Sequence, residues 1–413
     1  MPRILPLMGG SVFFFIMCSP VVFAESVRVL MAQDVALLEI HCEGDFAVVT
    51  EDGKTKIARS TIHVSSRKDG LQMDGRRITG EQILIRPLKH HLSLVATQMA
   101  GIDVDARLKS PGQGRVAVTQ GPLLSVSGIV KVLRKGQKLS IVNQVDLEEY
   151  VKGVVPSEVS AAWHPEMLKV QAVAARTYVL YNKMLSGTRE YDVMSTIQDQ
   201  VYRGRSGVDH RVEEAVESTR GIVVTHLQAP IYAAFSSTAA GPTEDAVNVW
   251  ANKDLPYLKG VECPFDIESP YYQWKVNVKL DQLEQNLRRQ GVSVGTIATI
   301  TPIAYSRAGR VARLRILHSG GETVLRGEDL RKAAGYTIIP STQFEVESIG
   351  ADVVFTGYGA GHAVGLCQWG AKELAELGYS YPSILQYYYP GTELRNAAVS
   401  QLMAPAIPTP GCC

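Results

Sequence analysis

The sequence predicts an α+β protein in which a smaller β-rich N-terminal domain precedes a β-rich main domain with buried helices. Short apolar runs broken by Gly and Asp fill the first quarter of the chain, and helical runs appear only later, scattered among further strands. This order does not fit a regular doubly wound sheet. The length of 413 residues allows two or three domains, and 46% hydrophobic with 20% charged residues is typical of a globular protein.

Charge and motif content exclude several classes of function. Lys and Arg total 42 against 41 for Asp and Glu, with no long basic run, so we expect no nucleic-acid partner. The six cysteines form no Cys-x-x-Cys pair, which argues against a zinc ribbon. Neither Gly-x-Ser-x-Gly nor His-Glu-x-x-His is present, which argues against a serine hydrolase and a zinc hydrolase.

Residues 1–24 have the pattern of a signal peptide. Arg3 supplies a basic start, an apolar stretch follows to Ala24, and small or compact residues stand at the expected cleavage site. The alternative is an uncleaved membrane anchor. With cleavage, we expect an exported protein of the periplasm or cell envelope, with no membrane segment in the mature chain.

Residues 25–118 are predicted to form the β-rich N-terminal region, whose role the sequence leaves unknown. Apolar runs that predict strands occur at Ser26–Leu30, Phe46–Thr50, Ile62–Val64 and Ile83–Ile85. A linker-like patch at 110–114 closes the region.

Residues 119–395 are predicted to form the main domain. A hairpin is expected from Val130–Leu133 and Leu139–Val142, and Pro165 marks the start of a buried apolar helix that extends to Leu185. Further strands are predicted at 222–235 and 310–317, and further helices at Leu280–Gln290, Gly327–Ala334, Ala371–Leu377 and Pro382–Tyr388. Residues 396–413 form a Pro-containing tail that we expect to be disordered.

Glu158 is the carboxylate most suited to catalysis. Apolar residues surround it and Trp163 follows closely, so burial is expected to raise its pKa and prepare it to donate a proton. The alternative is a surface glutamate near a helix start, stabilised by the helix dipole.

Arg176 lies among alanines and valines in the apolar helix, where a guanidinium needs a partner. Glu158 and an anionic or hydroxyl-rich ligand are both candidates. A structural ion pair without a catalytic role is the alternative.

The glycines of residues 357–361 precede His362 and suggest a close approach of the backbone to a ligand or another segment. His362 is a candidate hydrogen-bond donor or proton shuttle, with a buried structural role as the alternative. Aromatic residues that suit sugar rings include Trp274, Trp369 and Tyr387–Tyr389, although core packing explains most of them.

Taken together, these segments resemble the SpoIID/LytB family, named for the stage II sporulation protein D and the amidase enhancer. The resemblance spans about two-thirds of the chain, from Ser127 to Leu394, in blocks that keep the family's order. The blocks are Val145–Tyr150 leading into Gly153–Glu158, Gln171–Tyr178, Gln200–Tyr202, Ser237-Thr238 with Gly241 and Thr243-Glu244, Pro256–Lys259, Gly361-His362 with Gly365, Gln368–Ala371 and Tyr388–Gly391.

The resemblance implies a lytic transglycosylase that acts on peptidoglycan glycan strands stripped of peptides. It places the catalytic glutamate on Glu158 and the helix arginine on Arg176. Hydrolysis is the alternative outcome if Asp199 or Glu244 approaches as a second carboxylate. The substrate-binding positions that it implies are Tyr257, Lys259, Gln200, Tyr202, Ser237, Thr238, His362 and Gln368.

The chain departs from the family pattern at positions that bear on metal binding and catalysis. This chain has Ser236 where family members often have a histidine. It has Ala363 and Cys367 where they usually have glycine and serine. Some members hold zinc with Cys and His near here, but Met194, Ser195, Ser236 and Ala239 supply no such ligands, so we expect no metal and no cofactor. Two non-enzymatic alternatives follow: a wall-binding enhancer of an N-acetylmuramoyl-L-alanine amidase, and a glycan-binding protein attached through residues 25–118.

Overall fold

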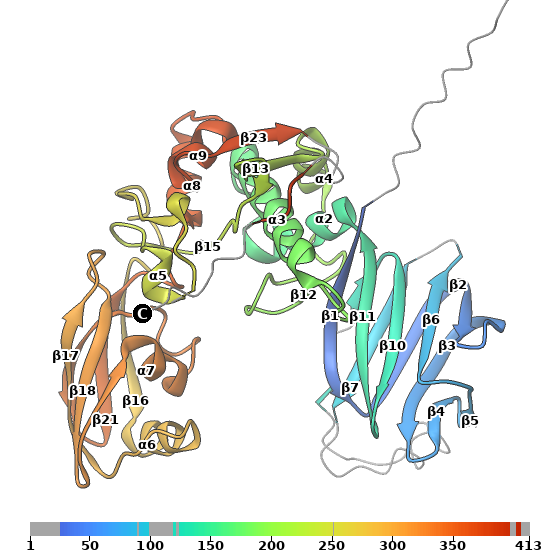
Figure 1. Cartoon of the computed structure of the whole chain (residues 1–413), viewed down its shortest axis with the longest axis horizontal. Helices are drawn as coiled ribbons and strands as arrows, with labels where there is room; N and C mark the ends of the chain where they lie inside the picture. Colours follow the sequence, from blue (N-terminus) through green and yellow to red (C-terminus); the bar gives the residue numbers. More distant parts are fainter. Residues whose placement is uncertain are drawn as a thin grey trace, which may run out of the picture.

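The computed structural model describes residues 25–88, 91–98, 119–120, 124–250, 252–396 and 402–405. The predicted signal peptide, the linker at 110–114 and most of the tail lie outside these residues. The described chain forms three parts: an N-terminal sheet, a central helical part and a second β lobe, with the helical part between the two β parts (Figure 1).

The N-terminal part is one twelve-stranded sheet in the order β12-β1-β11-β10-β6-β2-β3-β4-β5, with β7 on β2 and both β8 and β9 on β7. Its strands are β1 (Ser26–Val35), β2 (Leu37–Thr50), β3 (Thr55–Arg67), β4 (Gly70–Met73), β5 (Arg76–Arg77), β6 (Gln82–Pro87), β7 (Leu92–Gln98), β8 (Thr119–Gln120), β9 (Leu124–Val126), β10 (Ile129–Lys135), β11 (Lys138–Asp146) and β12 (Val193–Met194). Strands from both sides of residue 118 therefore share one sheet.

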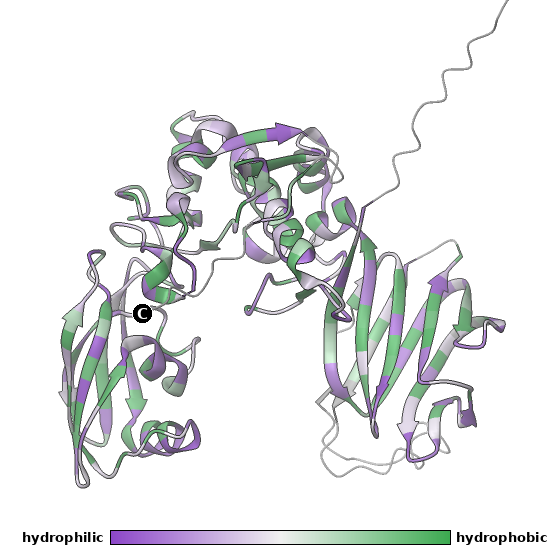
Figure 2. Ribbon diagram, in the orientation of Figure 1, coloured by the Kyte–Doolittle hydropathy of each residue, from purple (hydrophilic) through white to green (hydrophobic). Residues whose placement is uncertain are grey.

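Strand β2 carries two different partners on one side, because its pairing changes along its length. Residues 37–41 pair with β7, and residues 46–50 pair with β6. A register shift between Cys42 and Phe46 separates the two segments, as a β-bulge does. Alternate residues of the strands enclose an apolar core that includes Ile40, Val64 and Ile85, and the strands of Figure 2 show this alternation of green and purple.

The central part packs the helices that carry the predicted site. Helix α2 (Leu147–Glu158) follows β11 directly and packs against α3 (Pro165–Ser186) and α4 (His210–Ser218). The other elements of this part are β13 (Ile222–His226), β14 (Ala229–Pro230), β15 (Phe235–Ser236), α5 (Ala246–Val249), η1 (Pro256–Leu258), β22 (Leu366–Cys367), α8 (Gln368–Glu376), α9 (Tyr381–Tyr388) and β23 (Glu393–Asn396). They share one large core, to which α3 contributes most of its length.

The second β lobe is inserted between β15 and β22 and has its own core. It contains two three-stranded sheets, β16-β21-β20 and β17-β18-β19, with α6 and α7 packed against them. Its elements are β16 (Gln273–Lys279), α6 (Leu280–Arg289), β17 (Ile297–Tyr305), β18 (Val311–His318), β19 (Gly321–Arg326), α7 (Gly327–Ala334), β20 (Gln343–Ile349) and β21 (Asp352–Tyr358).

The structure confirms the α+β, β-rich fold class. The expected hairpin is β10–β11, closed at Lys135 and Lys138, and Pro165 begins α3 at the position where a missing N–H costs nothing. Helix α2 was missed, because Gly153 and Pro156 interrupt its helical pattern. No helix of the described residues combines the length and apolar character required to cross a membrane.

Candidate active site

Helix α2 positions Glu158 by ending on it. The Asp146 side chain caps the other end and accepts the backbone N–H groups of Glu148 at 2.9 Å and Glu149 at 3.3 Å. Val159 then turns to an extended conformation and stops the helix. The alternative of a glutamate near a helix start is therefore wrong, since Glu158 lies at the C-terminal, negative end of the helix dipole.

The Glu158 carboxyl group is surrounded by protein but has no cation paired with it among the described residues. Oε1 accepts the backbone N–H of Val201 at 2.7 Å, and the Gln368 side chain donates a second hydrogen bond. Burial raises the pKa of this carboxyl group to about 7, although both hydrogen bonds and the exposed Arg203 act to lower it. The side chain thus binds and releases a proton near neutrality.

Two glutamine amides connect this carboxyl to α3. Gln368 begins α8, and its Nε2 donates to Oε1 of the fully buried Gln171 at 3.3 Å. The Gln171 Nε2 is buried with no hydrogen-bond partner among the described residues. Seven residues along the same helix, Tyr178 donates its hydroxyl to Asp199 Oδ1 at 2.9 Å, so a line of polar groups follows one face of α3.

Two tryptophans, one shortly after Glu158 and one directly after Gln368 in the sequence, meet in space. Trp163 lies in the loop after Glu158, and Trp369 follows Gln368. Their ring centroids are 5.1 Å apart in an edge-to-face arrangement, and both side chains are partly exposed. This pair offers flat apolar surface next to the residues that hold Glu158, as sugar rings require.

Arg176 does not pair with Glu158. Its guanidinium is fully buried and binds Glu148 through Nε and Nη2, with a shortest distance of 2.6 Å. The carbonyl oxygens of Ile222 and Val216 accept the remaining donors. Neither candidate partner, Glu158 or a ligand, contacts Arg176. The guanidinium forms an enclosed ion pair with Glu148, as the structural alternative held, and has no exposed surface.

The two candidate second carboxylates differ in how they are held. Asp199 accepts bonds from Tyr178 and from the Met194 backbone N–H, and it lies two residues before the Val201 that binds Glu158. Glu244 is buried, and both of its oxygens accept hydrogen bonds, from the Asp245 N–H and the side chains of Asn248 and Ser306.

Gln200 and Tyr202, on either side of Val201, anchor this loop to the core by their side chains. Gln200 is fully buried and accepts the Tyr150 hydroxyl at 3.0 Å. Tyr202 donates its hydroxyl to Asn143 at 3.1 Å and packs against Tyr150, with ring centroids 5.1 Å apart. The structure places both side chains in the core rather than on an accessible surface.

Tyr257 and Lys259 occupy different environments. Tyr257 is buried, and its hydroxyl accepts the Tyr232 backbone N–H at 3.1 Å. Lys259 is exposed and forms ion pairs with Asp245 and Asp254. Only Lys259 of the two is open to a ligand in this conformation.

Ser237, Thr238 and His362 lie where β15 and β22 meet the second lobe. Ser237 is partly exposed, whereas Thr238 is fully buried and shares a hydrogen bond with Ser269 at 2.6 Å. His362 accepts the Val364 N–H at Nδ1 and packs edge-on against Trp250. Burial, with Arg331 and Arg310 nearby, lowers the pKa of His362 to about 3, so its imidazole is neutral near pH 7.

Two alanines near the contact of β15 with β22 adopt a backbone conformation that glycine favours. Ala240 and Ala363 have φ of 54° and 58°, in the left-handed region. Gly361 explains the expected close approach, because a Cβ there would lie 2.6 Å from the Ser236 Cβ.

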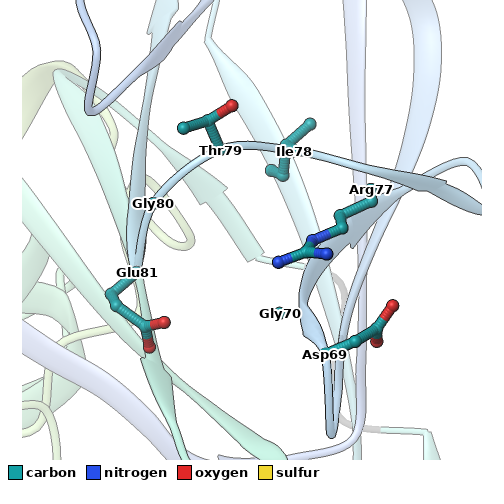
Figure 3. A pocket seen from close by; sticks show the side chains of 7 residues that line it. All are labelled: Asp69, Gly70, Arg77, Ile78, Thr79, Gly80 and Glu81. Atoms are coloured by element: carbon teal, nitrogen blue, oxygen red, sulfur yellow. The ribbon is translucent and has the colours of Figure 1, made fainter.

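A separate pocket of about 310 Å³ lies at the far end of the N-terminal sheet (Figure 3). Loops around β4, β5 and the start of β6 line it, through Asp69, Gly70, Arg77, Ile78, Thr79, Gly80 and Glu81. None of the predicted site residues contributes to it.

Sequence reasoning missed Val201, Gln171 and Glu148 as partners in this region. Val201 acts through its backbone N–H, which no side-chain pattern reports. Gln171 and Glu148 each lie in a block that resembles the family, and membership of such a block was the signal that could have identified them.

The comparisons with known proteins match the central part and the second β lobe. The family model described as stage II sporulation protein (SpoIID) matches residues 135–226, and one described as a domain of unknown function matches residues 263–365. The chain is 34% identical to stage II sporulation protein D of Bacillus subtilis over 62% of this chain and 76% of that protein. An uncharacterised protein of Brachyspira hyodysenteriae is 32% identical over 62% of this chain and 68% of its own length.

The amidase enhancer of Bacillus subtilis is 31% identical over 60% of this chain but only 40% of its own length. The SpoIID family model, which matches residues 135–226, covers α2, α3 and α4, the helices that position Glu158 and its surroundings. The chain belongs to the stage II sporulation protein D (SpoIID) family.

Proposed function

We propose that the protein is an exported lytic transglycosylase that cleaves the bond between N-acetylmuramic acid and N-acetylglucosamine in peptide-stripped glycan strands. One observation carries this proposal: Glu158, at the C-terminal end of α2, has uncharged donors around it and a pKa of about 7. A carboxyl group with such a pKa holds a proton to donate and binds it again afterwards.

Glu158 first acts as a general acid. It transfers its proton to the oxygen that bridges the two sugars, and the glycosidic bond breaks as that oxygen takes the electron pair. The resulting carboxylate is stabilised by hydrogen bonds from the Val201 N–H and from Gln368. The N-acetylglucosamine leaves with a hydroxyl group.

Glu158 then acts as a general base. Its carboxylate accepts the proton of the muramic acid O6 hydroxyl while that oxygen bonds to the anomeric carbon of the same sugar. A 1,6-anhydro ring forms, no water is consumed and Glu158 regains its proton. One carboxyl group is enough for this cycle.

The partly exposed Trp163–Trp369 pair supports a glycan as the substrate. Two edge-to-face aromatic rings provide apolar area for the faces of pyranose rings. Lys372 lies close to this surface, with its Nζ 5.4 Å from the Trp369 ring centroid and 2.8 Å from Glu376 Oε2. The lactyl carboxylate of muramic acid would compete with Glu376 for this positive charge.

The similarity to an amidase enhancer favours a second candidate function. In that case the protein binds cell wall and stimulates an N-acetylmuramoyl-L-alanine amidase without cleaving glycan itself.

Mass spectrometry of digested, peptide-free glycan strands tests the proposal. Residues 25–413 should release fragments that end in 1,6-anhydro-N-acetylmuramic acid, and Glu158→Gln should release none. Glu149→Gln is the matched control, because Glu149 lies on the same helix but pairs with Lys152 and Arg205 instead. Reducing ends would indicate a hydrolase, and intact strands that still bind the protein would favour the enhancer.

A further inference from the structure

Two cysteines and an aspartate form a buried cluster next to the proposed active site. Cys263 and Asp266 lie in the loop after η1, and Cys367 is the last residue of β22, directly before Gln368. Each of the three is 1% exposed. One potential ligand atom from each residue lies within 4.8 Å of the other two, a spacing that one bound cation spans.

Asp266 has one oxygen saturated with hydrogen bonds and the other without any. Oδ2 accepts the backbone N–H groups of Ala239 and Ala240, both at 2.8 Å, and lies 3.2 Å from Cys367 Sγ. Oδ1 is buried and has no hydrogen-bond partner among the described residues. An acceptor that is removed from water and left unpartnered is costly, so this oxygen points to a missing ligand.

Hydrogen-bond donors face both sulfur atoms. The Ala239 N–H donates to Cys367 Sγ at 3.3 Å, and the Tyr388 hydroxyl lies 3.2 Å from Cys263 Sγ. Gly370 leaves room for this arrangement, because a Cβ there would lie 2.7 Å from Cys263 Sγ. The thiolate is the form of cysteine that binds metal, and hydrogen bonds to a metal ligand orient it.

The charge of the surroundings fits a metal held by anions. Arg310 is buried beside the cluster, and its Nη2 donates to the Ala239 carbonyl at 2.6 Å. Its Nε and Nη1 have no partner among the described residues. A divalent ion with two thiolates and one carboxylate carries a net charge of −1, which a nearby guanidinium balances.

We propose that Cys263, Asp266 and Cys367 bind one zinc ion. Two thiolates and a carboxylate oxygen are ligands that zinc takes in tetrahedral sites, and a solvent oxygen completes the coordination. Binding releases the two thiol protons to solvent. The expectation of no metal considered residues 194, 195, 236 and 239, and the proposed site uses different residues.

The zinc has a structural role in this arrangement. It fastens the end of β22 to the loop at 263–266, while the hydrogen bonds of Asp266 and Cys367 fix residues 239 and 240. The residue after Cys367 is Gln368, the side-chain donor to Glu158. The ion would therefore hold that donor in place without contacting substrate.

Metal analysis of the purified chain from residue 25 tests the site. Inductively coupled plasma mass spectrometry should find one zinc per chain, and Cys263→Ser, Cys367→Ser and Asp266→Asn should each lose it. Cys42→Ser is the matched control, because Cys42 is an equally buried cysteine in the N-terminal sheet. Cobalt exchanged into the wild type should give a sulfur-to-metal charge-transfer band.

Wild-type protein alone keeps the test decisive even if a variant fails to fold. A Cys263–Cys367 disulfide would overturn the proposal. It would appear as a mass lower by two hydrogens and as two cysteines that do not react with an alkylating reagent. Free thiols without metal, after purification in the presence of zinc, would overturn it as well. These readouts do not depend on glycan cleavage, so they stand apart from the test of Glu158.

Discussion

Helix α2 carries an acid at each end, Glu148 buried and Glu158 partly buried, and the two acids are held in opposite ways. Glu148, in the first turn, forms a bidentate ion pair with the fully buried Arg176 and accepts the Gly221 N–H at 3.3 Å. Glu158, the last residue, receives only uncharged donors and lies at the negative end of the helix dipole. The same type of side chain thus forms a buried ion pair at one end of the helix and has a pKa near neutrality at the other.

The difference shows what separates a structural acid from the proposed catalytic one in this fold. A buried glutamate with an arginine partner keeps its charge and joins two helices. A buried glutamate without one has its pKa raised towards neutrality, where it exchanges protons during a reaction. Substitutions at one of the two acids or at its partners test this contrast, with the other acid left unchanged for comparison.

The largest effect is expected on catalysis when Glu158 is changed to Gln. General acid–base catalysis contributes about 10²–10⁴-fold, so the rate of release of anhydro fragments should fall by at least that factor. The free energy of unfolding, measured in urea at neutral pH, should not decrease, because the amide needs no counter-charge. An active Glu158→Gln protein would remove Glu158 from the mechanism.

The second effect is on stability, when Arg176 is changed to Met. Glu148 is then buried without its counter-charge, which costs about 3–5 kcal/mol in urea unfolding. The double variant Glu148→Leu, Arg176→Met should regain most of that loss. Arg220→Met, at an exposed pair with Glu217, should cost less than about 1 kcal/mol, and an equal cost at both arginines would contradict the contrast.

The third effect is the pH dependence that Glu158 contributes to stability. Burial raises the pKa of its carboxyl group from 4.5 to about 7, so between these values the folded chain holds a proton that the unfolded chain has released. Its contribution is complete below pH 4.5 and is lost as the pH rises through about 7, with a slope of up to about 1.4 kcal/mol per pH unit.

Urea unfolding of wild type and Glu158→Gln across this range measures that slope as the difference between the two proteins. Glycan cleavage should also decline above pH 7, as the proton to be donated is lost. A pH-independent difference between the two proteins would show that the Glu158 pKa is ordinary.

The smallest effect is expected from Gln368→Leu. Its amide stabilises the charged form of Glu158, so its removal should raise the pKa further. One hydrogen bond of about 0.5–1.5 kcal/mol corresponds to roughly 0.4–1 pH unit. The alkaline limb of the activity profile should move upwards by that amount, whereas Gln282→Leu, on the exposed face of α6, should leave it in place.

Local signals in the sequence predicted much of the fold. Pro165 and the apolar run after it predicted α3, and the hydrophobic periods around 129–142 predicted the β10–β11 hairpin. The same signals missed that the helical part and the inserted lobe have separate cores, because the inserted lobe has strands and helices of the same kind as its surroundings.

The site was predictable only in part, for a physical reason. The apolar neighbours of Glu158 indicated a raised pKa, and Arg176 in an apolar helix indicated a buried partner. Which glutamate forms that pair depends on how α2 packs against α3, and local patterns do not determine the packing. The Gln171–Gln368 contact joins residues 197 positions apart, a separation at which hydrophobic periodicity carries no information.

That separation has a consequence for how the protein is made. Helices α2 and α3 are complete when less than half of the chain has left the ribosome, but β22 and α8 come almost at its end. Until then Glu158 has no Gln368 and Trp163 has no Trp369. A nascent or truncated chain would therefore carry Glu158 without the side-chain donor that stabilises its charged form.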